Sequence, residues 1–300
     1  MLEAFSLGLD IDSPDLAPLK SGLFWQAAFK LDWADDQFLQ ALYLLDTYTQ
    51  NGGTGIRERY EAESSTYVTE LFAERLPRQI ALFIGTGIHS LRSALDTAVS
   101  MIVREAGGKQ DMRVAFPFHS TESGLRASFE PGRRTCPDCG NTRNTKASMA
   151  LIRSSVPDLE RLVFEVFQPW EAGNYPLWAL NKLDNLQKHQ MLVTVLTTTS
   201  GAIDYITAEG VTNRSSLWTI QPGMVMEIQR SRRPLNVTKA PTISSELRFP
   251  KNVPFAGELV FDIVGRLYKL VRSILIAMQA HFEGGQSALA DGTISTKIAL

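Results

Sequence analysis

The chain has 300 residues, of which 44% are hydrophobic and 21% are charged, and 30 basic and 32 acidic side chains give a formal net charge of -2. This length and apolar content suffice for a full hydrophobic core. The balanced charge excludes a protein whose whole surface binds nucleic acid or anionic membrane, and two cysteines exclude a disulfide framework. No segment approaches the roughly 20 apolar residues of a membrane span, and residues 1–5 lack a secretory pattern. The sequence therefore predicts a soluble cytoplasmic protein.

The first part of the chain is predicted to be helical. Residues 33–50 place apolar side chains on one helix face, and a second helix is expected over about residues 57–76. The third helix, over about residues 78–106, repeats apolar residues at helical spacing and is closed by two glycines at 107–108. Gly85 and Gly87 inside it predict either a kink or the close approach of a neighbouring helix.

The second part of the chain changes from helical to strand-rich patterns. Further helices are expected after Pro157 and over residues 176–189. The composition then becomes rich in Val, Ile, Thr and Trp, with short strands expected at 191–196, 202–206, 217–220, 224–228, 247–249 and 258–261. Short connections favour antiparallel pairing. A last helix with a strong apolar stripe is expected over about residues 264–282.

These elements predict an α+β fold, mainly a helical bundle with a small antiparallel β-sheet inserted before the last helix. The simplest organisation is an N-terminal segment over residues 1–30 and one helical-bundle domain over residues 31–285. The sheet insert occupies about residues 190–262, and a flexible tail follows over residues 286–300. The alternative is a split into a helical and a sheet domain near residue 190.

Two predicted helices carry a polar stripe on an otherwise apolar surface. In the helix over residues 78–106, one narrow sector contains His89, Ser93, Asp96 and Ser100, with Arg92 on its edge. In the helix over residues 176–189, one quadrant contains Asn181, Asp184, Asn185 and Lys188. Because these are mostly short or planar hydrogen-bonding side chains, we expect a buried polar cluster that bridges the two helices. Such a cluster is either a functional site or an interhelical clamp without chemistry, and two solvated surface faces are the simpler alternative.

The same two segments resemble a widespread bacterial family of uncharacterised proteins. Its members have a His-Asn-Leu-Arg-Ser-Ala-Leu-Asp helix, matched here by His89 to Asp96, followed by a Leu-Trp-x-Leu-x-x-Leu-Asn-x-x-Asp-Lys-His segment. The second segment is matched by residues 177–189. Two landmarks between them, at residues 116–118 and 167–170, are also similar. The resemblance spans about residues 78–196 and implies no established activity.

A more distant resemblance is to HEPN-type ribonuclease domains, small helical bundles that often form dimers. In those domains an Arg-x4-His motif acts on RNA, with the arginine holding developing negative charge and the histidine moving a proton. This chain has Arg92 but carries Thr97 where the motif histidine would stand. The resemblance implies that His89 or His189 would have to supply the proton transfer, next to Arg92 and Asp96.

A separate motif is the pair Cys136 and Cys139 around a tight turn that ends in Gly140. Such a turn aims two thiolates at one tetrahedral zinc ion. The site needs two more ligands, from a second subunit of a homodimer or from His119 and a carboxylate. A vestigial or purely structural turn is the alternative.

Two functions follow from these observations. The first is a non-catalytic binding or scaffold protein whose interhelical polar cluster holds a ligand, with RNA or a nucleotide as candidates, or locks the bundle. The second is a HEPN-like, metal-independent ribonuclease or nucleotide-acting enzyme. We expect no cofactor other than zinc at the cysteine pair.

Overall fold

The computed structural model describes residues 17–107, 114–130, 133–135, 142–144, 148–190, 196–202, 204–206, 212–214, 218–234, 236–237 and 242–283. The protein has the predicted α+β fold, mainly helical with antiparallel sheets. It divides into two compact units, described separately. The helical unit takes Met1–Gln37, Gly85–Leu192 and Asp262–Leu300, and the strand unit takes Phe38–Ile84 and Val193–Phe261.

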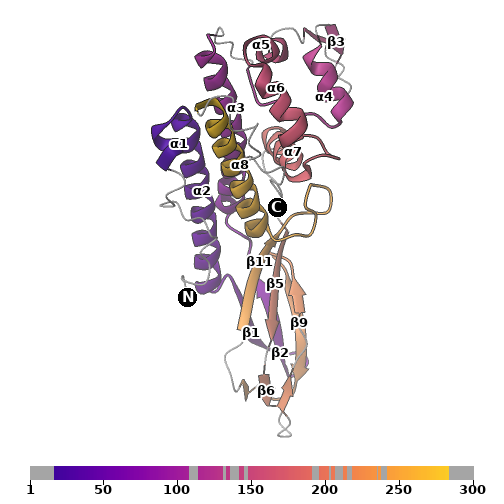
Figure 1. The fold of residues 1–300 in the computed structure, drawn as a ribbon. Helices are drawn as coiled ribbons and strands as arrows, with labels where there is room; N and C mark the ends of the chain where they lie inside the picture. The colour runs from indigo at the N-terminus through magenta and orange to yellow at the C-terminus, as the bar shows by residue number, and fades with distance from the viewer. Residues whose placement is uncertain are drawn as a thin grey trace. The chain divides into compact units, whose positions relative to one another are not determined.

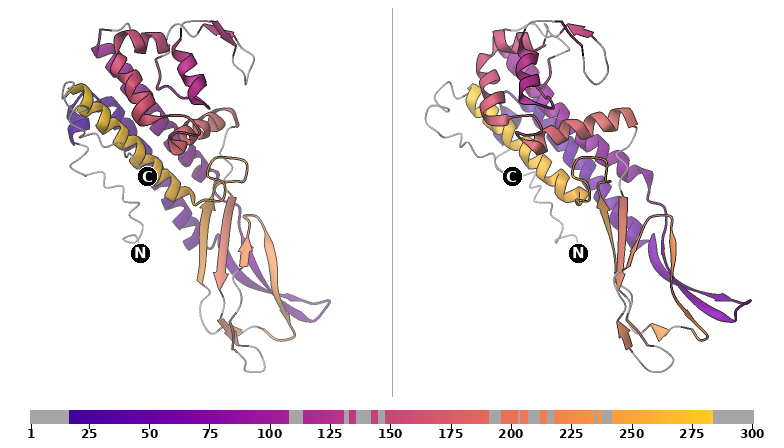
Figure 2. Two further views of the ribbon diagram at one scale, coloured as in Figure 1. Left: turned by 45° about the vertical axis from the view of Figure 1, so that its right-hand side comes forward. Right: turned by 90° about the vertical axis from the view of Figure 1, so that its right-hand side faces the viewer.

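The helical unit is built around three long helices, α2 (Trp25–Gln50), α3 (Arg78–Glu105) and α8 (Val260–Glu283), which lie side by side in this unit (Figures 1 and 2). The first part of α2, most of α3 and nearly all of α8 belong to it. Its shorter elements are α1 (Ala17–Ser21), α4 (Glu122–Phe129), α5 (Ser148–Ser155), α6 (Pro157–Leu162), the π-helix η3 (Val163–Phe167), α7 (Tyr175–Gln190) and the hairpin of β3 (Arg133–Thr135) with β4 (Thr142–Asn144).

Apolar residues at helical spacing explain why these helices form and pack. The α3 and α8 side chains that are fully buried include Ile84, Ile88, Leu91, Leu95, Val264, Val271, Ile274 and Leu275. Pro157 begins α6, where its missing N–H removes no helical hydrogen bond. The helices predicted over residues 78–106, 176–189 and 264–282 are confirmed as α3, α7 and α8, and the one predicted over residues 33–50 begins earlier, at Trp25.

Among its described residues, the strand unit contains three small antiparallel sheets. The first joins β1 (Thr54–Glu61), β2 (Thr66–Ala73) and β9 (Val225–Ser231), and the second joins β11 (Thr242–Arg248), β5 (Leu196–Ala202) and β8 (Trp218–Ile220). The third joins β10 (Asn236–Val237), β6 (Asp204–Ile206) and β7 (Thr212–Arg214). Leu71 and Ala73 of β2 are buried with Ile220 of β8, so a small core connects the first two sheets.

The helix predicted over residues 57–76 is wrong, because this segment forms the β1–β2 hairpin. The run of Arg and Glu in β1 is compatible with an exposed helix face, but Arg57 lies directly opposite Glu70 in the hairpin. Thr66, Tyr67 and Val68 are residue types that favour strands. The first sheet is therefore assembled from two separate parts of the chain, the β1–β2 hairpin and β9, and only β9 was predicted as a strand.

The strand predicted over residues 258–261 is also wrong. Only Leu259 forms an isolated bridge, to Arg248, and α8 begins at Val260. The strands predicted at 202–206, 217–220 and 224–228 correspond to β6, β8 and β9, with shifted ends. The strand predicted at 191–196 overlaps β5 at Leu196. Its other residues, 191–195, lie outside the described part of the chain.

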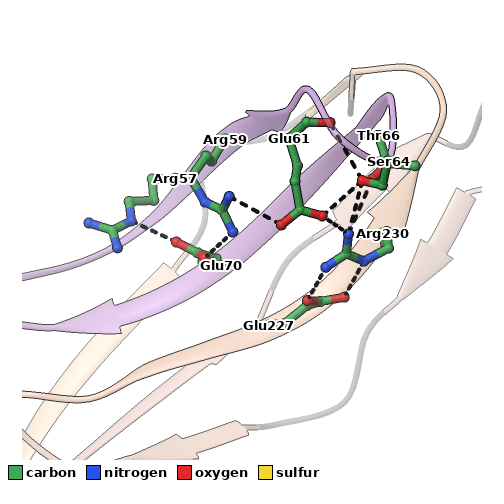
Figure 3. A network of polar contacts seen from close by, with 8 residues as sticks. All are labelled: Arg57, Arg59, Glu61, Ser64, Thr66, Glu70, Glu227 and Arg230. Carbon is green, nitrogen blue, oxygen red and sulfur yellow. Dashed lines mark hydrogen bonds and ion pairs between the residues drawn. The ribbon is translucent and has the colours of Figure 1, made fainter.

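A network of charged side chains crosses the first sheet near the tip of the hairpin (Figure 3). Glu70 accepts from Arg57, with Nε 2.9 Å from Oε2, and Arg230 of β9 forms ion pairs with both Glu227 and Glu61. Hydrogen bonds from Arg230 and Ser64 lower the pKa of Glu61 to about 2. These contacts tie the end of the hairpin to β9, and because they are solvent-exposed we expect salt to weaken them.

Candidate functional site

The predicted bridge between the two polar stripes is present in the helical unit, where side-chain hydrogen bonds join α3 and α7. His89 contacts Asp184, and Arg92 donates to Asn181. Apolar residues on both helices are buried beside these contacts, including Ile88, Leu91, Leu180 and Leu183. Gln187 of α7 lies over Gly85 of α3, where a Cβ atom would be 2.2 Å from its Nε2, so the close approach of a helix expected at this glycine is confirmed.

One half of the cluster is centred on Asp184, whose side chain is 1% exposed. His89 Nδ1 lies 2.8 Å from Asp184 Oδ1, and Lys188 Nζ lies 2.6 Å from Oδ2. Burial opposes ionisation of this carboxyl, but the hydrogen bonds and charges of His89 and Lys188 outweigh it and lower its pKa. Because an ionised carboxylate only accepts hydrogen bonds, the proton of the imidazole is held on Nδ1.

The two partners of Asp184 are half open to solvent, with 51% of the His89 side chain and 49% of the Lys188 side chain exposed. Within the described part of the chain, the hydrogen bond of His89 is made by Nδ1, and none reaches Nε2. The Lys188 ammonium also has donors beyond the one that Asp184 accepts. A buried carboxylate therefore fixes two exposed groups that can meet a ligand.

The other half of the cluster is centred on Arg92, whose side chain is only 12% exposed. Its Nε donates to Asn181 Oδ1 at 3.1 Å, and its Nη1 donates to Asp96. Its guanidinium lies over the ring of Phe118, 4.4 Å from the centroid. Protein groups surround this cation on several sides, which is typical of a structural clamp.

Asp96 and Ser100 connect α3 to the extended segment before α4. Asp96 Oδ1 accepts from the backbone N–H of Phe116 at 2.8 Å, and the Ser100 hydroxyl donates to the carbonyl of Val114 at 3.2 Å. Ser93, from the same predicted sector, accepts from Lys30 of α2 at 2.7 Å. The polar stripe of α3 is thus shared among three neighbours, and only its first part faces α7.

Of the remaining predicted residues, only Asn185 has a side chain that the structure describes, and it does not join the cluster. Asn185 is exposed, and no hydrogen bond connects it to the cluster within the described residues. The side chain of His189, and the pair Cys136 and Cys139, lie outside the part of the chain that the structure describes. In that part, no group of three or more His, Cys, Asp or Glu side chains could hold a metal ion.

A second polar cluster, between α2 and α8, was not predicted. Asp35 is fully buried, and neither of its carboxylate oxygens has a hydrogen-bond partner among the described residues. Burial, followed by the nearby charges of Asp36 and Asp32, raises its pKa to about 6. The hydroxyl of Tyr268, on α8, is also buried and has no hydrogen-bond partner among the described residues. Burial, followed by the charges of Asp35 and Asp32, raises the pKa of this hydroxyl to about 12.

Comparison of the chain with protein-family models, with curated proteins and with solved structures finds no match. None of the described helices is long and apolar enough to cross a membrane. The geometry of the cluster between α3 and α7 is therefore the basis of the proposed function.

Proposed function

We propose that this protein is a non-catalytic binding protein of the cytoplasm that holds an anionic ligand at His89 and Lys188, with the phosphate of an RNA or nucleotide as the ligand group. The proposal is supported by one observation: a buried carboxylate, Asp184, positions two half-exposed groups from two helices, the Lys188 ammonium and the His89 imidazole, whose Nε2 donates to an anion when the ring is protonated. Donors held in place by protein lose little entropy on binding, and charge-assisted hydrogen bonds to phosphate are among the strong ones. Arg92 contacts Asn181, Asp96 and Phe118, and its hydrogen bond to Asn181 helps to hold the two helices of the site together.

Binding of a fluorescently labelled single-stranded RNA oligonucleotide, followed by anisotropy, tests this proposal. We expect Lys188→Met to weaken binding about fivefold to tenfold and to reduce the slope of log affinity against log salt by about 1, because one phosphate contact is lost. His89→Gln should weaken binding to a similar extent. Lys182→Met is the matched control, since Lys182 is an exposed lysine of α7 that is not part of the cluster.

Equal RNA affinities for wild type, Lys188→Met and Lys182→Met would refute the site. Loss of affinity in both lysine variants to the same degree would indicate binding by overall charge and would also contradict the proposal. Inorganic phosphate as a competitor separates recognition of the phosphate from recognition of bases.

A metal-independent ribonuclease is the second candidate, favoured by the contact between His89 and Asp184. A carboxylate that holds Nδ1 leaves Nε2 of an imidazole available for proton transfer, which is the arrangement of a general acid or base. The same RNA, incubated with the protein in the presence of a metal chelator, decides between the candidates. Cleavage that His89→Gln abolishes would replace the binding function by this one, and intact RNA would exclude this nuclease activity.

A further inference from the structure

One face of α2 in the helical unit exposes three large aromatic side chains. Trp25, Phe29 and Trp33 are 45%, 63% and 55% exposed. They follow one another at intervals of four residues, which places them within about 80° of the helix circumference. Single exposed apolar residues are ordinary on protein surfaces, but a contiguous aromatic stripe marks an interaction surface.

The stripe is held in place by the packing of the rest of the helix. Ala27, Ala28 and Leu31, on other faces of α2, are buried, so rotation of the helix cannot hide the aromatic residues. The rings of Trp25 and Phe29 pack edge to face, with centroids 5.9 Å apart and an interplanar angle of 84°. Rigid aromatic side chains lose little conformational entropy when they bind, which is why tryptophan is frequent among the dominant residues of interfaces.

The charges around this stripe are acidic. Asp36 is exposed on the same face, one helical turn after Trp33, and has no ion-pair or hydrogen-bond partner among the described residues. Asp32 lies beside the stripe and pairs with Lys20 at 3.2 Å. Lys30, the only basic residue in this part of α2, is directed to Ser93 of α3. The face therefore combines exposed aromatic rings with an unpaired carboxylate.

We propose that this face docks an amphipathic helix of another protein, one whose apolar stripe is flanked by lysine or arginine. Asp36 supplies the complementary charge, and the three aromatic residues supply the apolar contact. A second copy of the chain fits less well, because pairing of the same face would bring the Asp36 carboxylates of two molecules together. Residues 1–16 of this chain also lack complementarity, since they contain four acidic and no basic residues. The inference does not depend on the cluster between α3 and α7.

Two labelled helical peptides of the same pattern test the proposal, one built from Leu and Lys and the other from Leu and Glu. We expect the Leu/Lys peptide to bind the full-length protein and the Leu/Glu peptide not to bind. Trp33→Ser should weaken binding of the Leu/Lys peptide at least tenfold, and Asp36→Lys should weaken it about as much by reversing the charge. Tyr60→Ser is the matched control, because Tyr60 is an aromatic residue of the strand unit that is 55% exposed.

Equal binding of both peptides, or equal loss of affinity in Trp33→Ser and Tyr60→Ser, would overturn the proposal. Light scattering on the free protein gives an independent check. A stable dimer that Trp33→Ser dissociates would assign the face to a second copy instead. Binding to neutral phosphatidylcholine vesicles that requires Trp33 would assign it to a membrane surface. Circular dichroism of each variant establishes that a loss of binding does not result from unfolding.

Discussion

Replacing Asp35 with asparagine is expected to raise the stability of the protein at neutral pH by about 1 to 3 kcal/mol, the upper figure being the shift of its pKa from 3.8 to about 6 expressed as free energy. Its carboxylate is fully buried without a hydrogen-bond partner in the described part of the chain. A charge in this position is costly, whereas a neutral amide of the same shape avoids most of that cost.

The raised pKa of Asp35 also determines how its effect on the free energy of unfolding changes with pH. The unfolded chain releases this proton near pH 3.8, whereas the folded protein retains it until about pH 6. Between these values the folded state binds more protons, so the free energy of unfolding falls as pH rises, and the full cost is present above pH 6. Asp35→Asn should therefore have little effect near pH 4 and its largest effect above pH 6.

Urea unfolding between pH 4 and pH 8, followed by the circular dichroism of the helices, measures this difference. Asp46→Asn is the control, because Asp46 is an exposed residue of the same helix that accepts from Gln50. We expect that substitution to change stability by no more than about 0.5 kcal/mol. A stability gain for Asp35→Asn that is the same at pH 4 and pH 8 would show that the charge of Asp35 is not the cause.

Asp35, which was not predicted as a site residue, shows what kind of signal a buried acidic residue leaves in a sequence. Asp35 lies between Leu31 and Phe38 on a buried helix face, and an acid between two apolar residues at helical spacing is a visible signal. The helix predicted from the sequence begins at residue 33, which leaves Leu31 outside it, whereas α2 begins at Trp25. Tyr268, whose pKa is raised in part by the charge of Asp35, resembles any other apolar position of α8 in the sequence. The pairing of two distant helices is not encoded in the periodicity of either one.

The polar stripes of α3 and α7 were predictable because helix geometry alone decides which residues share a face. Arg92 pairs with Asp96, four residues further along the same helix, which is the spacing at which helical side chains meet. The ring of Phe118 over Arg92 and the backbone of Phe116 on Asp96 were not predicted, since a non-helical segment has no period that places it. The same limit explains the hairpin of β1 and β2, where the pairing of Arg57 with Glu70 depends on a turn between them.

The second large effect is expected for Arg92→Ala, which should reduce the free energy of unfolding by about 2 to 4 kcal/mol. The substitution removes the hydrogen bonds to Asn181 and Asp96 and the contact with Phe118, all made by a side chain that is 12% exposed. Asp96 is 34% exposed and keeps the N–H of Phe116, so solvent and backbone limit the loss. Thermal or urea unfolding of the variant measures it.

Arg126→Ala is the matched control for this substitution. Arg126 has an acidic partner four residues away, Glu122, and its guanidinium lies 4.3 Å from the centroid of Phe164, so it makes the same kinds of contact as Arg92. Its side chain is 57% exposed, and we expect a loss of no more than about 1 kcal/mol. The difference between the two variants isolates the effect of burial and of the hydrogen bond to Asn181.

These stability measurements, together with RNA binding, distinguish the role of the Arg92 half of the α3–α7 cluster from the role of the Asp184 half. If Arg92→Ala destabilises far more than Arg126→Ala, Arg92 acts as the clamp that holds α7 and the segment of Phe116 on α3. Lys188→Met should then weaken RNA binding with a stability loss of about 1 kcal/mol, smaller than that of Arg92→Ala, because Lys188 is half exposed and His89 still holds the buried Asp184 carboxylate. Equal stability losses in the two arginine variants would mean that Arg92 contributes little to folding, and that a partly buried cation is retained for a role in ligand binding or catalysis.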